Sequence, residues 1–437
     1  MNQRAIGVLA AFAVGCAGAN TASQVEPGAV TSSATVSVSV SVRCPEGQSC
    51  AGQPPTQRAN FARPAAMRRP VEPRAAVVAT PRSPTPPRPV TGIFAGHQHA
   101  CALMDDRSLY CWGRNDRGQT SQIDRPRVTC SRHESECVAY DGDDSRTWAP
   151  MRVDALSAVR SVALGESVSC ASTEDGTLRC WGYHGAMRGE GSFRERADGM
   201  RAVRPVLGLS NARHVHLGLR GGCAVSDTGD VRCFNAGYLE LETMRRLRSM
   251  QQVIEGDYQL CGWDGGDSLR CMDIGMELTR EGVEHARFVA REPLGWTARH
   301  NGREVCAWTR RGRVECGGNS GGYSHGTVRL TEVEGLRDVV QVVGGDAHYC
   351  ARTRDGAVWC WGSNGSGQLG DGTTVTRNVP VRVERLPEAV SIAAGASFNC
   401  AIVRDGRVMC WGDNDWGQLG GENRRESERT DPGPVLW

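Results

Sequence analysis

The sequence predicts an all-β repeat protein, and two observations support this class. The first is a spacing, because seven pairs of cysteines stand ten residues apart along the chain, from Cys101–Cys111 to Cys400–Cys410. So many occurrences of one spacing indicate internal repeats. The second is the segment between the cysteines, as in Arg354-Asp355-Gly356, where Asp-Gly separates two strand-like runs and is a strong hairpin signal.

The hairpin explains the cysteine spacing. Gly356 supplies the positive φ angle of the turn, which places Cys350 opposite Cys360, and facing residues of an antiparallel pair are close enough for a disulfide. In the first repeat, Asp106-Arg107 lacks the turn glycine. We expect seven disulfides, each within its own hairpin: Cys101–Cys111, Cys170–Cys180, Cys223–Cys233, Cys261–Cys271, Cys306–Cys316, Cys350–Cys360 and Cys400–Cys410.

The remaining cysteines form two further candidate disulfides, Cys44–Cys50 and Cys130–Cys137, and leave Cys16 alone among the 19. Such a density of cysteine favours an oxidising compartment, the periplasm or the cell exterior. Zinc binding is the alternative explanation for paired cysteines. Zinc sites use short knuckles with two to four residues between ligands, a spacing that none of the seven repeat pairs has.

Further motifs follow each clear hairpin, as in Trp361-Gly362, Asn364 and Gly367-Gln368-Leu369-Gly370. With Pro380-Val381-Arg382-Val383 and Ala393-Ala394-Gly395, they resemble the regulator of chromosome condensation repeat, including bacterial proteins described as alpha-tubulin suppressor-like. The resemblance is specific in the first two and last two copies and covers most of the chain beyond residue 90. It implies a seven-bladed β-propeller, and the intervals between copies suit four-stranded blades.

The middle copies depart from this pattern, because Phe234-Asn235, Met272-Asp273 and Gly317-Gly318 replace Trp-Gly. In the clear copies we expect the tryptophan after the second cysteine to pack between blades. These residues are Trp112, Trp181, Trp361 and Trp411. We also expect the C-terminal Pro434-Val435-Leu436-Trp437 to complete the first blade and so close the ring.

The N-terminal region predicts export and a tether. Residues 1–16 resemble a lipoprotein signal, in which Cys16 becomes the acylated first residue, while cleavage after Ala17-Gly18-Ala19 is the alternative. Residues 17–88 are rich in proline, arginine and serine and predict a disordered N-terminal tether. A solvated linker explains its arginines, and contact with anionic wall polymer or lipid headgroups is the second interpretation. Residues 89–437 form the predicted propeller.

Composition excludes several kinds of chemistry. The formal charge is +2, and all 51 basic residues are arginine, which excludes lysine Schiff bases and P-loops. His99 and His348 occupy the same place in two repeats, so we interpret them as structural rather than as metal ligands. The acidic run Asp141–Asp144 lacks an ordered calcium-ligand pattern. We therefore expect no catalytic residue, metal or cofactor.

The longest departure from the repeat is an insertion at residues 120–148, which holds Cys130–Cys137. Loops on a rigid repeat scaffold commonly carry recognition. Aromatic and arginine side chains on such a loop are typical anchors. We therefore predict that Tyr140, Arg146 and Trp148 bind a partner, with a surface insertion of no consequence as the alternative.

These observations predict a binding module. We expect a monomeric, lipid-anchored protein of a bacterial cell envelope, on the outer membrane or cell surface or alternatively secreted, that binds a protein or cell-surface partner. The family's eukaryotic founder acts on a nuclear GTPase and chromatin, and that role does not transfer to an exported, disulfide-rich chain, so we expect no nucleic acid. The closer analogy is an exported bacterial propeller that inhibits a β-lactamase, which implies protein binding. The alternatives are a propeller hydrolase or lyase with a site in the central channel, and a passive envelope component.

Overall fold

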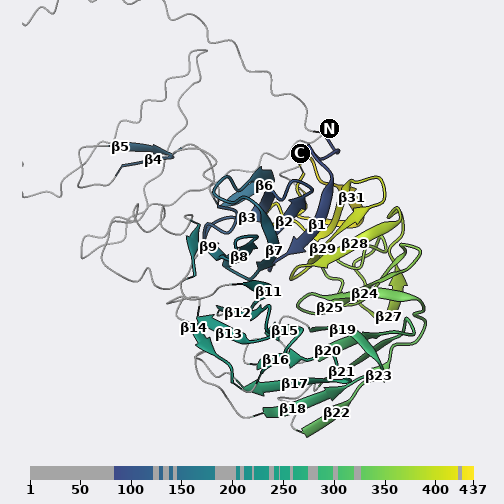
Figure 1. The fold of residues 1–437 in the computed structure, drawn as a ribbon. Coiled ribbons are helices and arrows are strands. Elements are labelled where there is room, and N and C mark those ends of the chain that lie inside the picture. The colour runs from purple at the N-terminus through teal and green to yellow at the C-terminus, as the bar shows by residue number, and fades with distance from the viewer. Residues whose placement is uncertain are drawn as a thin grey trace, which may run out of the picture. The chain divides into compact units, whose positions relative to one another are not determined.

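The computed structural model describes residues 83–121, 127–130, 137–140, 145–182, 203–206, 211–218, 221–235, 241–245, 247–255, 259–273, 284–298, 304–318, 326–421 and 426–437. Cys16, the Cys44–Cys50 pair and residues 17–82 of the tether lie outside the described residues. Every regular element described is a strand, and seven sheets follow one another around a ring (Figure 1). In the same part of the chain we find no helix with the length and hydrophobicity needed to span a bilayer.

Each sheet is one blade, and the chain visits the blades in order. Blade 1 contains β1 (Val90–Ala95), β2 (His99–Met104), β3 (Leu109–Arg114) and β6 (Arg146–Arg152). Blade 2 contains β7 (Val159–Leu164), β8 (Val168–Thr173), β9 (Leu178–Gly182) and β10 (Arg204–Pro205). Blade 3 contains β11 (Ala212–Leu217), β12 (Gly221–Ser226), β13 (Val231–Asn235) and β14 (Leu241–Thr243).

The next two blades share an extra link. Blade 4 contains β15 (Gln252–Glu255), β16 (Gln259–Trp263), β17 (Ser268–Asp273) and β18 (Glu284–Val289). Blade 5 contains β19 (Pro293–Ala298), β20 (Glu304–Thr309), β21 (Val314–Gly318) and the short β23 (Thr331–Glu332). Between β21 and β23, the chain adds β22 (Gly326–Arg329) to blade 4 as a fifth strand, parallel to β18.

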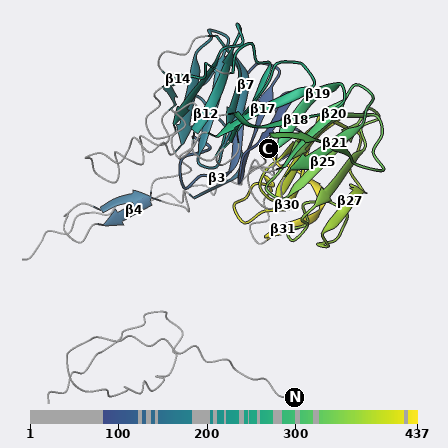
Figure 2. The same ribbon diagram turned by 90° about the horizontal axis from the view of Figure 1, so that it is seen from below.

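Two blades complete the ring. Blade 6 contains β24 (Val339–Gly344), β25 (His348–Thr353), β26 (Val358–Gly362) and β27 (Arg377–Arg382). Blade 7 contains β28 (Ala389–Ala394), β29 (Phe398–Val403), β30 (Val408–Asp413) and β31 (Glu428–Pro434). The first strand of each blade contacts the first strand of the next, and β28 contacts β1. Figure 2 shows the same blades turned by 90°. The predicted seven-bladed β-propeller is confirmed.

The hairpin geometry agrees with the cysteine prediction. In all seven blades the two cysteines face each other across the second and third strands, with Cα atoms 4.0–4.1 Å apart, and each pair forms a disulfide. The turn glycine has positive φ, for example 87° at Gly356. Arg107 adopts the same left-handed conformation in blade 1, with a φ of 65°, so a side chain is tolerated there at some conformational cost.

Tryptophan side chains join neighbouring blades, as predicted. Trp112 is fully buried against blade 7 and donates its indole hydrogen to the carbonyl oxygen of Gln418 at 2.9 Å. Trp181 and Trp411 donate in the same way to the preceding blade, at 2.7 and 3.0 Å, to the carbonyls of Gln119 and Gln368. Trp361 packs into the core shared with blade 5.

The middle blades fill the tryptophan position differently. Phe234 and Met272 follow the second cysteine and are buried against blades 2 and 3, respectively. In blade 5, where Gly317 stands at this position, a Cβ would lie 2.8 Å from the Leu330 side chain. A residue from the outer part of the blade therefore occupies the space.

The prediction that the C-terminal residues complete the first blade is wrong. β31 pairs with β30 of its own blade. Among the described strands, only β22 joins a blade other than that of its neighbours in the chain. Blade 1 already has an outer strand, β6, which begins within the last residues of the predicted insertion. The last residues instead pack across the junction of blades 1 and 7, where Val435 is buried and the Trp437 ring meets Tyr110 and Trp112 edge-on.

Candidate functional site

The connections between strands lie at the two ends of the propeller. At one end, which we call the loop face, the chain crosses from the third to the outer strand of each blade. These crossings include the long links from Arg114 to Arg146, from Gly182 to Arg204 and from Asp273 to Glu284. The opposite end, the turn face, carries the short cysteine-hairpin turns. The chain therefore places its longest variable segments on one face.

The insertion predicted to carry recognition leaves from the loop face. It contains a two-stranded sheet of β4 (Arg127–Cys130) and β5 (Cys137–Tyr140), in which Cys130 stands opposite Cys137. This register suits the predicted disulfide, which stays a prediction because these side chains lie outside the described residues. Tyr140 ends β5 and its side chain is likewise not described. Arg146 and Trp148 lie on β6.

Arg146 and Trp148 form a group with the side chains of Arg114 and Trp416. We call these four side chains the Trp–Arg cluster. The guanidinium carbon of Arg146 lies 5.6 Å from the ring centre of Trp148 and 5.4 Å from that of Trp416. Arg114 lies 4.5 Å from the Trp416 ring centre. These distances are in the range of cation–π attraction. The cluster thus joins blade 1 to the loop of blade 7.

Arg114 and Trp416 were not predicted from the sequence. The available signal was Trp416 itself, since a large aromatic stands between Asn414 and Gly417 where blade 6 has Ser366. Gly417 allows a close approach, because a Cβ there would lie 3.0 Å from the Trp148 ring. All four side chains of the cluster are half-buried, so part of each indole and guanidinium faces solvent.

The two arginines of the cluster differ in their partners. Arg114 donates to both carboxylate oxygens of Asp116 at 2.7 and 2.8 Å and to Gln98 at 2.7 Å. Although partial burial alone would raise the pKa of Asp116, these contacts with Arg114 hold it below its usual range. Arg146 has no carboxylate partner in the described part of the chain, and its buried Nε has no hydrogen-bond acceptor there. The cluster therefore carries a net positive charge at Arg146.

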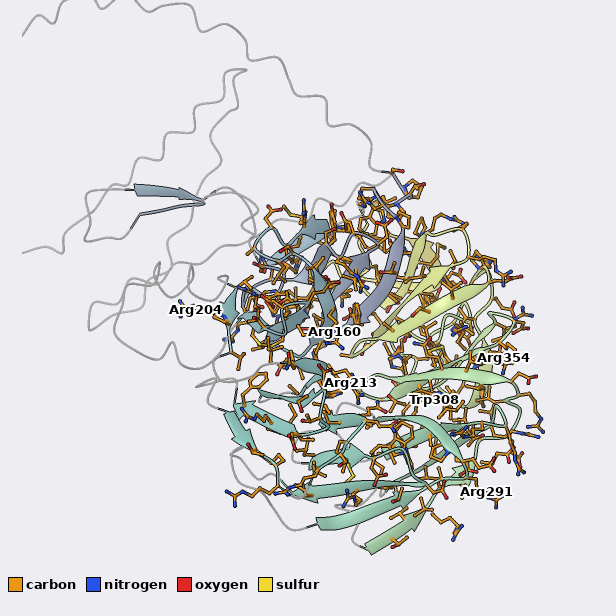
Figure 3. The ribbon with its side chains drawn as sticks, viewed as in Figure 1. Arg160, Arg204, Arg213, Arg291, Trp308 and Arg354 are labelled. Carbon is orange, nitrogen blue, oxygen red and sulfur yellow. A yellow bond between two sulfur atoms is a disulfide. The ribbon has the colours of Figure 1, made fainter. Side chains whose placement is uncertain are left out.

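A central cavity of about 470 Å³, which we call the channel, is lined by residues of the inner strands of all seven blades. Its walls are mainly apolar or backbone, and Trp308, labelled near the middle of the ring in Figure 3, is one of its lining residues. His97, Glu166, His214 and His216 also line it. Within the described ranges we find no group of three or more histidine, cysteine, aspartate or glutamate side chains arranged to hold a metal ion.

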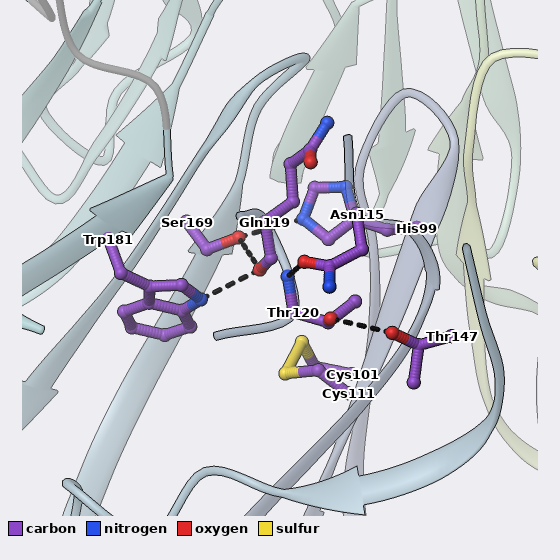
Figure 4. Close-up of a disulfide and its surroundings, with 9 residues drawn as sticks. All are labelled: His99, Cys101, Cys111, Asn115, Gln119, Thr120, Thr147, Ser169 and Trp181. Carbon is purple, nitrogen blue, oxygen red and sulfur yellow. Dashed lines mark hydrogen bonds between the residues drawn. A yellow bond between two sulfur atoms is a disulfide. The ribbon is translucent and has the colours of Figure 1, made fainter. Parts of the chain in front are cut away.

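His99 and His348 lie between blades, as their repeated position indicated. His99 is fully buried and its Nε2 contacts the Ser169 hydroxyl of blade 2 at 2.8 Å (Figure 4). Burial and the neighbouring charges of His97 and Arg114 lower the pKa of His99 to about 3, so its imidazole stays neutral. His348 contacts Asn399 of blade 7 at 3.1 Å in the same way.

His97 forms a charged link at the channel mouth. Its Nε2 lies 3.1 Å from a carboxylate oxygen of Asp346, which belongs to blade 6. Main-chain hydrogen bonds run through the same turns, from Ala396 to the His97 carbonyl and from Asp346 to the Ala396 carbonyl. The His97–Asp346 pair thus joins blade 1 to blade 6 across the turn of blade 7 that lies between them. Burial lowers the pKa of His97, but the hydrogen bond and charge of Asp346, with that of Glu166, outweigh it and raise the pKa overall.

This link predicts a pH-dependent stability. The pKa of His97 is higher in the folded protein than its unfolded value of about 6.5. The stabilisation that the His97–Asp346 pair provides is therefore fully present below about pH 6.5 and is lost as pH rises through the folded pKa. Both groups are partly exposed, so we expect less than about 1 kcal/mol. The His97→Gln substitution should lower the free energy of unfolding, and this loss should be larger at about pH 5.5 than at about pH 8.5. Asp346→Asn should show the same pH dependence, and a constant difference would contradict the assignment.

Family comparison agrees with this architecture. Two family models described as Regulator of chromosome condensation (RCC1) repeat match the chain, one at residues 355–402 and the other at residues 90–119, 159–185, 339–368 and 389–418. The matched segments fall in blades 1, 2, 6 and 7. Blades 3 to 5, which have the same cysteine pair, lie outside these matched segments.

Known proteins with similar sequences include two of very different length. The human E3 ubiquitin-protein ligase HERC2 is 26% identical over 300 residues, which cover 67% of this chain but 5% of that protein. The Ultraviolet-B receptor UVR8 of Arabidopsis thaliana is 24% identical over 367 residues, covering 68% of this chain and 82% of the receptor. This chain therefore matches only a small part of the ligase and most of the receptor.

A solved structure supports the fold. The crystal structure of human WBSCR16 superimposes with a TM-score of 0.58 at 16% identity and covers 75% of this chain and 93% of that one. At this identity the likeness concerns the fold alone. The repeat matches show that blades 1, 2, 6 and 7 of this chain contain regulator of chromosome condensation (RCC1) repeats.

Proposed function

We propose that this protein is an exported, lipid-anchored propeller that binds a protein partner through its loop face and has no catalytic role. The observation that carries the proposal is the Trp–Arg cluster, in which Arg146 lies between two indoles without a carboxylate partner in the described part of the chain. Half-buried aromatic and arginine side chains on rigid strands are typical anchors of protein interfaces.

The disulfides support the exported part of the proposal. Seven bonds in one chain are typical of proteins that fold in an oxidising compartment. Acylation of Cys16 would fix the protein to a membrane at the end of the tether and leave the propeller free to reach a partner. Tyr140, at the end of β5 in the same insertion, would add an aromatic contact with the partner.

Cross-linking in intact cells followed by mass spectrometry tests the interaction. We expect wild-type protein to capture a defined partner, and the double variant Arg146→Gln/Trp148→Ala to lose at least about nine-tenths of it, as for removal of central anchors. Arg404→Gln is the matched control, because Arg404 is an exposed arginine of the turn face that pairs with Glu388. Equal capture by the double variant and wild type, at equal melting temperature, would place the binding surface elsewhere.

The anchor has an independent test. Cys16→Ala should move the protein from the membrane fraction to the soluble fraction of the same cells without changing its melting temperature, because Cys16 precedes the propeller. Recovery of this variant with membranes at the wild-type level would contradict lipid anchoring.

A further inference from the structure

A second surface lies on the turn face, far along the chain from the insertion. A groove of about 740 Å³ runs over blade 6 and is lined by Arg337, Asp338, Arg354, Asp355, Trp359 and Arg382, among others. We propose that this groove, which we call the blade 6 groove, binds an acidic segment of a partner protein that carries an apolar side chain next to its carboxylates.

Unpaired arginines give the groove its charge. Arg337 pairs with Glu332 at 3.4 Å. Arg354, labelled at the right of Figure 3, and Arg382 are both exposed, and neither forms an ion pair within the described residues. Planar guanidinium groups bind carboxylates through two parallel hydrogen bonds, so these two side chains are suited to acidic residues of a partner.

The acidic residues of the groove, Asp338 and Asp355, offset part of the charge of its three arginines, and the charge of Arg382 acts on Asp355. One carboxylate oxygen of Asp355 accepts hydrogen bonds from the Thr353 hydroxyl and from the main-chain nitrogen of Ala357. These bonds hold the pKa of Asp355 below its usual range and commit that oxygen to the turn. Asp338 stands at the start of the inner strand, where its carbonyl accepts from the Arg354 main chain.

Apolar surface adjoins the arginines. Trp359 stands directly opposite Arg382 on the neighbouring strand and is half-buried. Val390 is 47% exposed, because it is the unpaired residue of a β-bulge between Ala389 and Ser391. Val390 is not a lining residue of the groove but follows Ala389, whose main-chain nitrogen donates to the Gly356 carbonyl at 2.8 Å in the turn beside the groove.

This combination favours an acidic peptide over other anions. A phosphate or sulfate polymer would bring dense negative charge against Asp338 and Asp355 and would leave Val390 and Trp359 without an apolar contact. The chain's own tether is also unsuitable, because its arginines would meet the arginines of the groove. A peptide with alternating carboxylate and apolar side chains satisfies both parts of the surface.

Selection from a displayed library of random peptides on the full chain tests the proposal. We expect the enriched peptides to hold an excess of aspartate and glutamate beside an apolar residue. Synthetic copies should bind Arg354→Gln/Arg382→Gln about tenfold more weakly than wild type, and Val390→Ser more weakly as well. Arg404→Gln is again the control, since it removes one turn-face arginine outside the groove and should leave binding unchanged.

Four results would overturn the proposal. Enriched peptides without acidic excess would do so, as would peptides that bind both groove variants as tightly as wild type. Peptides whose binding falls only in Arg146→Gln/Trp148→Ala would belong to the loop face. Dextran sulfate serves as a polyanion probe. If it binds tightly in a way that depends on Arg354 and Arg382, and if the selected peptides hold no apolar residue, the groove binds polyanions instead.

Discussion

Replacing Gly312 with alanine is expected to lower the free energy of unfolding by about 3 kcal/mol. Gly312 has a φ of 69°, a conformation that disfavours a side chain. A Cβ at this position would also lie 2.6 Å from the Cα atom of Asp338 and 2.8 Å from its nitrogen, at the start of the next blade. Since main-chain atoms cannot move aside cheaply, two blades must separate. Urea unfolding of the purified protein measures the loss.

The same substitution at Gly406 separates the two causes. Gly406 has a φ of 85° in the equivalent turn of blade 7, but a Cβ there would meet nothing within 4 Å. Gly406→Ala should therefore cost only the conformational strain, about 1 kcal/mol. Equal losses in the two variants would show that contact with the next blade contributes nothing.

Removing Val435 to Trp437 is expected to lower the unfolding free energy by about 3–5 kcal/mol. Val435 is fully buried in the core shared by blades 1 and 7, and the Trp437 ring packs on Tyr110 and Trp112. The main-chain nitrogen of Leu436 donates to Gly420 at 2.7 Å and that of Trp437 to Ser83 at 2.8 Å. We expect a fall in melting temperature of roughly 5–10 °C by calorimetry.

A second variant distinguishes packing from chain length. Val435→Ala keeps the main-chain bonds and removes only buried methyl groups, so it should cost about 1–3 kcal/mol, less than the truncation. A truncated protein that melts at the wild-type temperature would mean that the first and last blades hold together without these residues.

Local features made the hairpins predictable. A spacing of ten residues and a turn glycine define a cysteine pair within one short segment, so the disulfides and the seven repeats could be found even where Trp-Gly is lost. The outer strand of blade 1 could not, because the insertion separates β6 from its hairpin and strand pairing over such a distance has no local signal. β22 escaped prediction for the same reason, since its partner β18 belongs to another blade.

The candidate site was predicted in part. Arg146 and Trp148 stood out because they interrupt the repeat within one segment. Their neighbour Trp416 lies far along the chain in the last blade and reaches them only because the ring closes. The blade 6 groove had no sequence signal at all, because Arg354 and Arg382 resemble the solvated arginines found throughout this chain.

The contact between the first and last described residues of the chain, Ser83 and Trp437, has a consequence for how such a ring can be rearranged. Because the Trp437 nitrogen bonds to the Ser83 carbonyl and no outer strand is borrowed across that junction, the boundary between blades 1 and 7 is one blade junction among seven. A circular permutant that joins these ends and opens another junction would keep most of the inter-blade contacts. Gene duplication can likewise add or remove a whole blade at the ends of the reading frame without splitting a sheet.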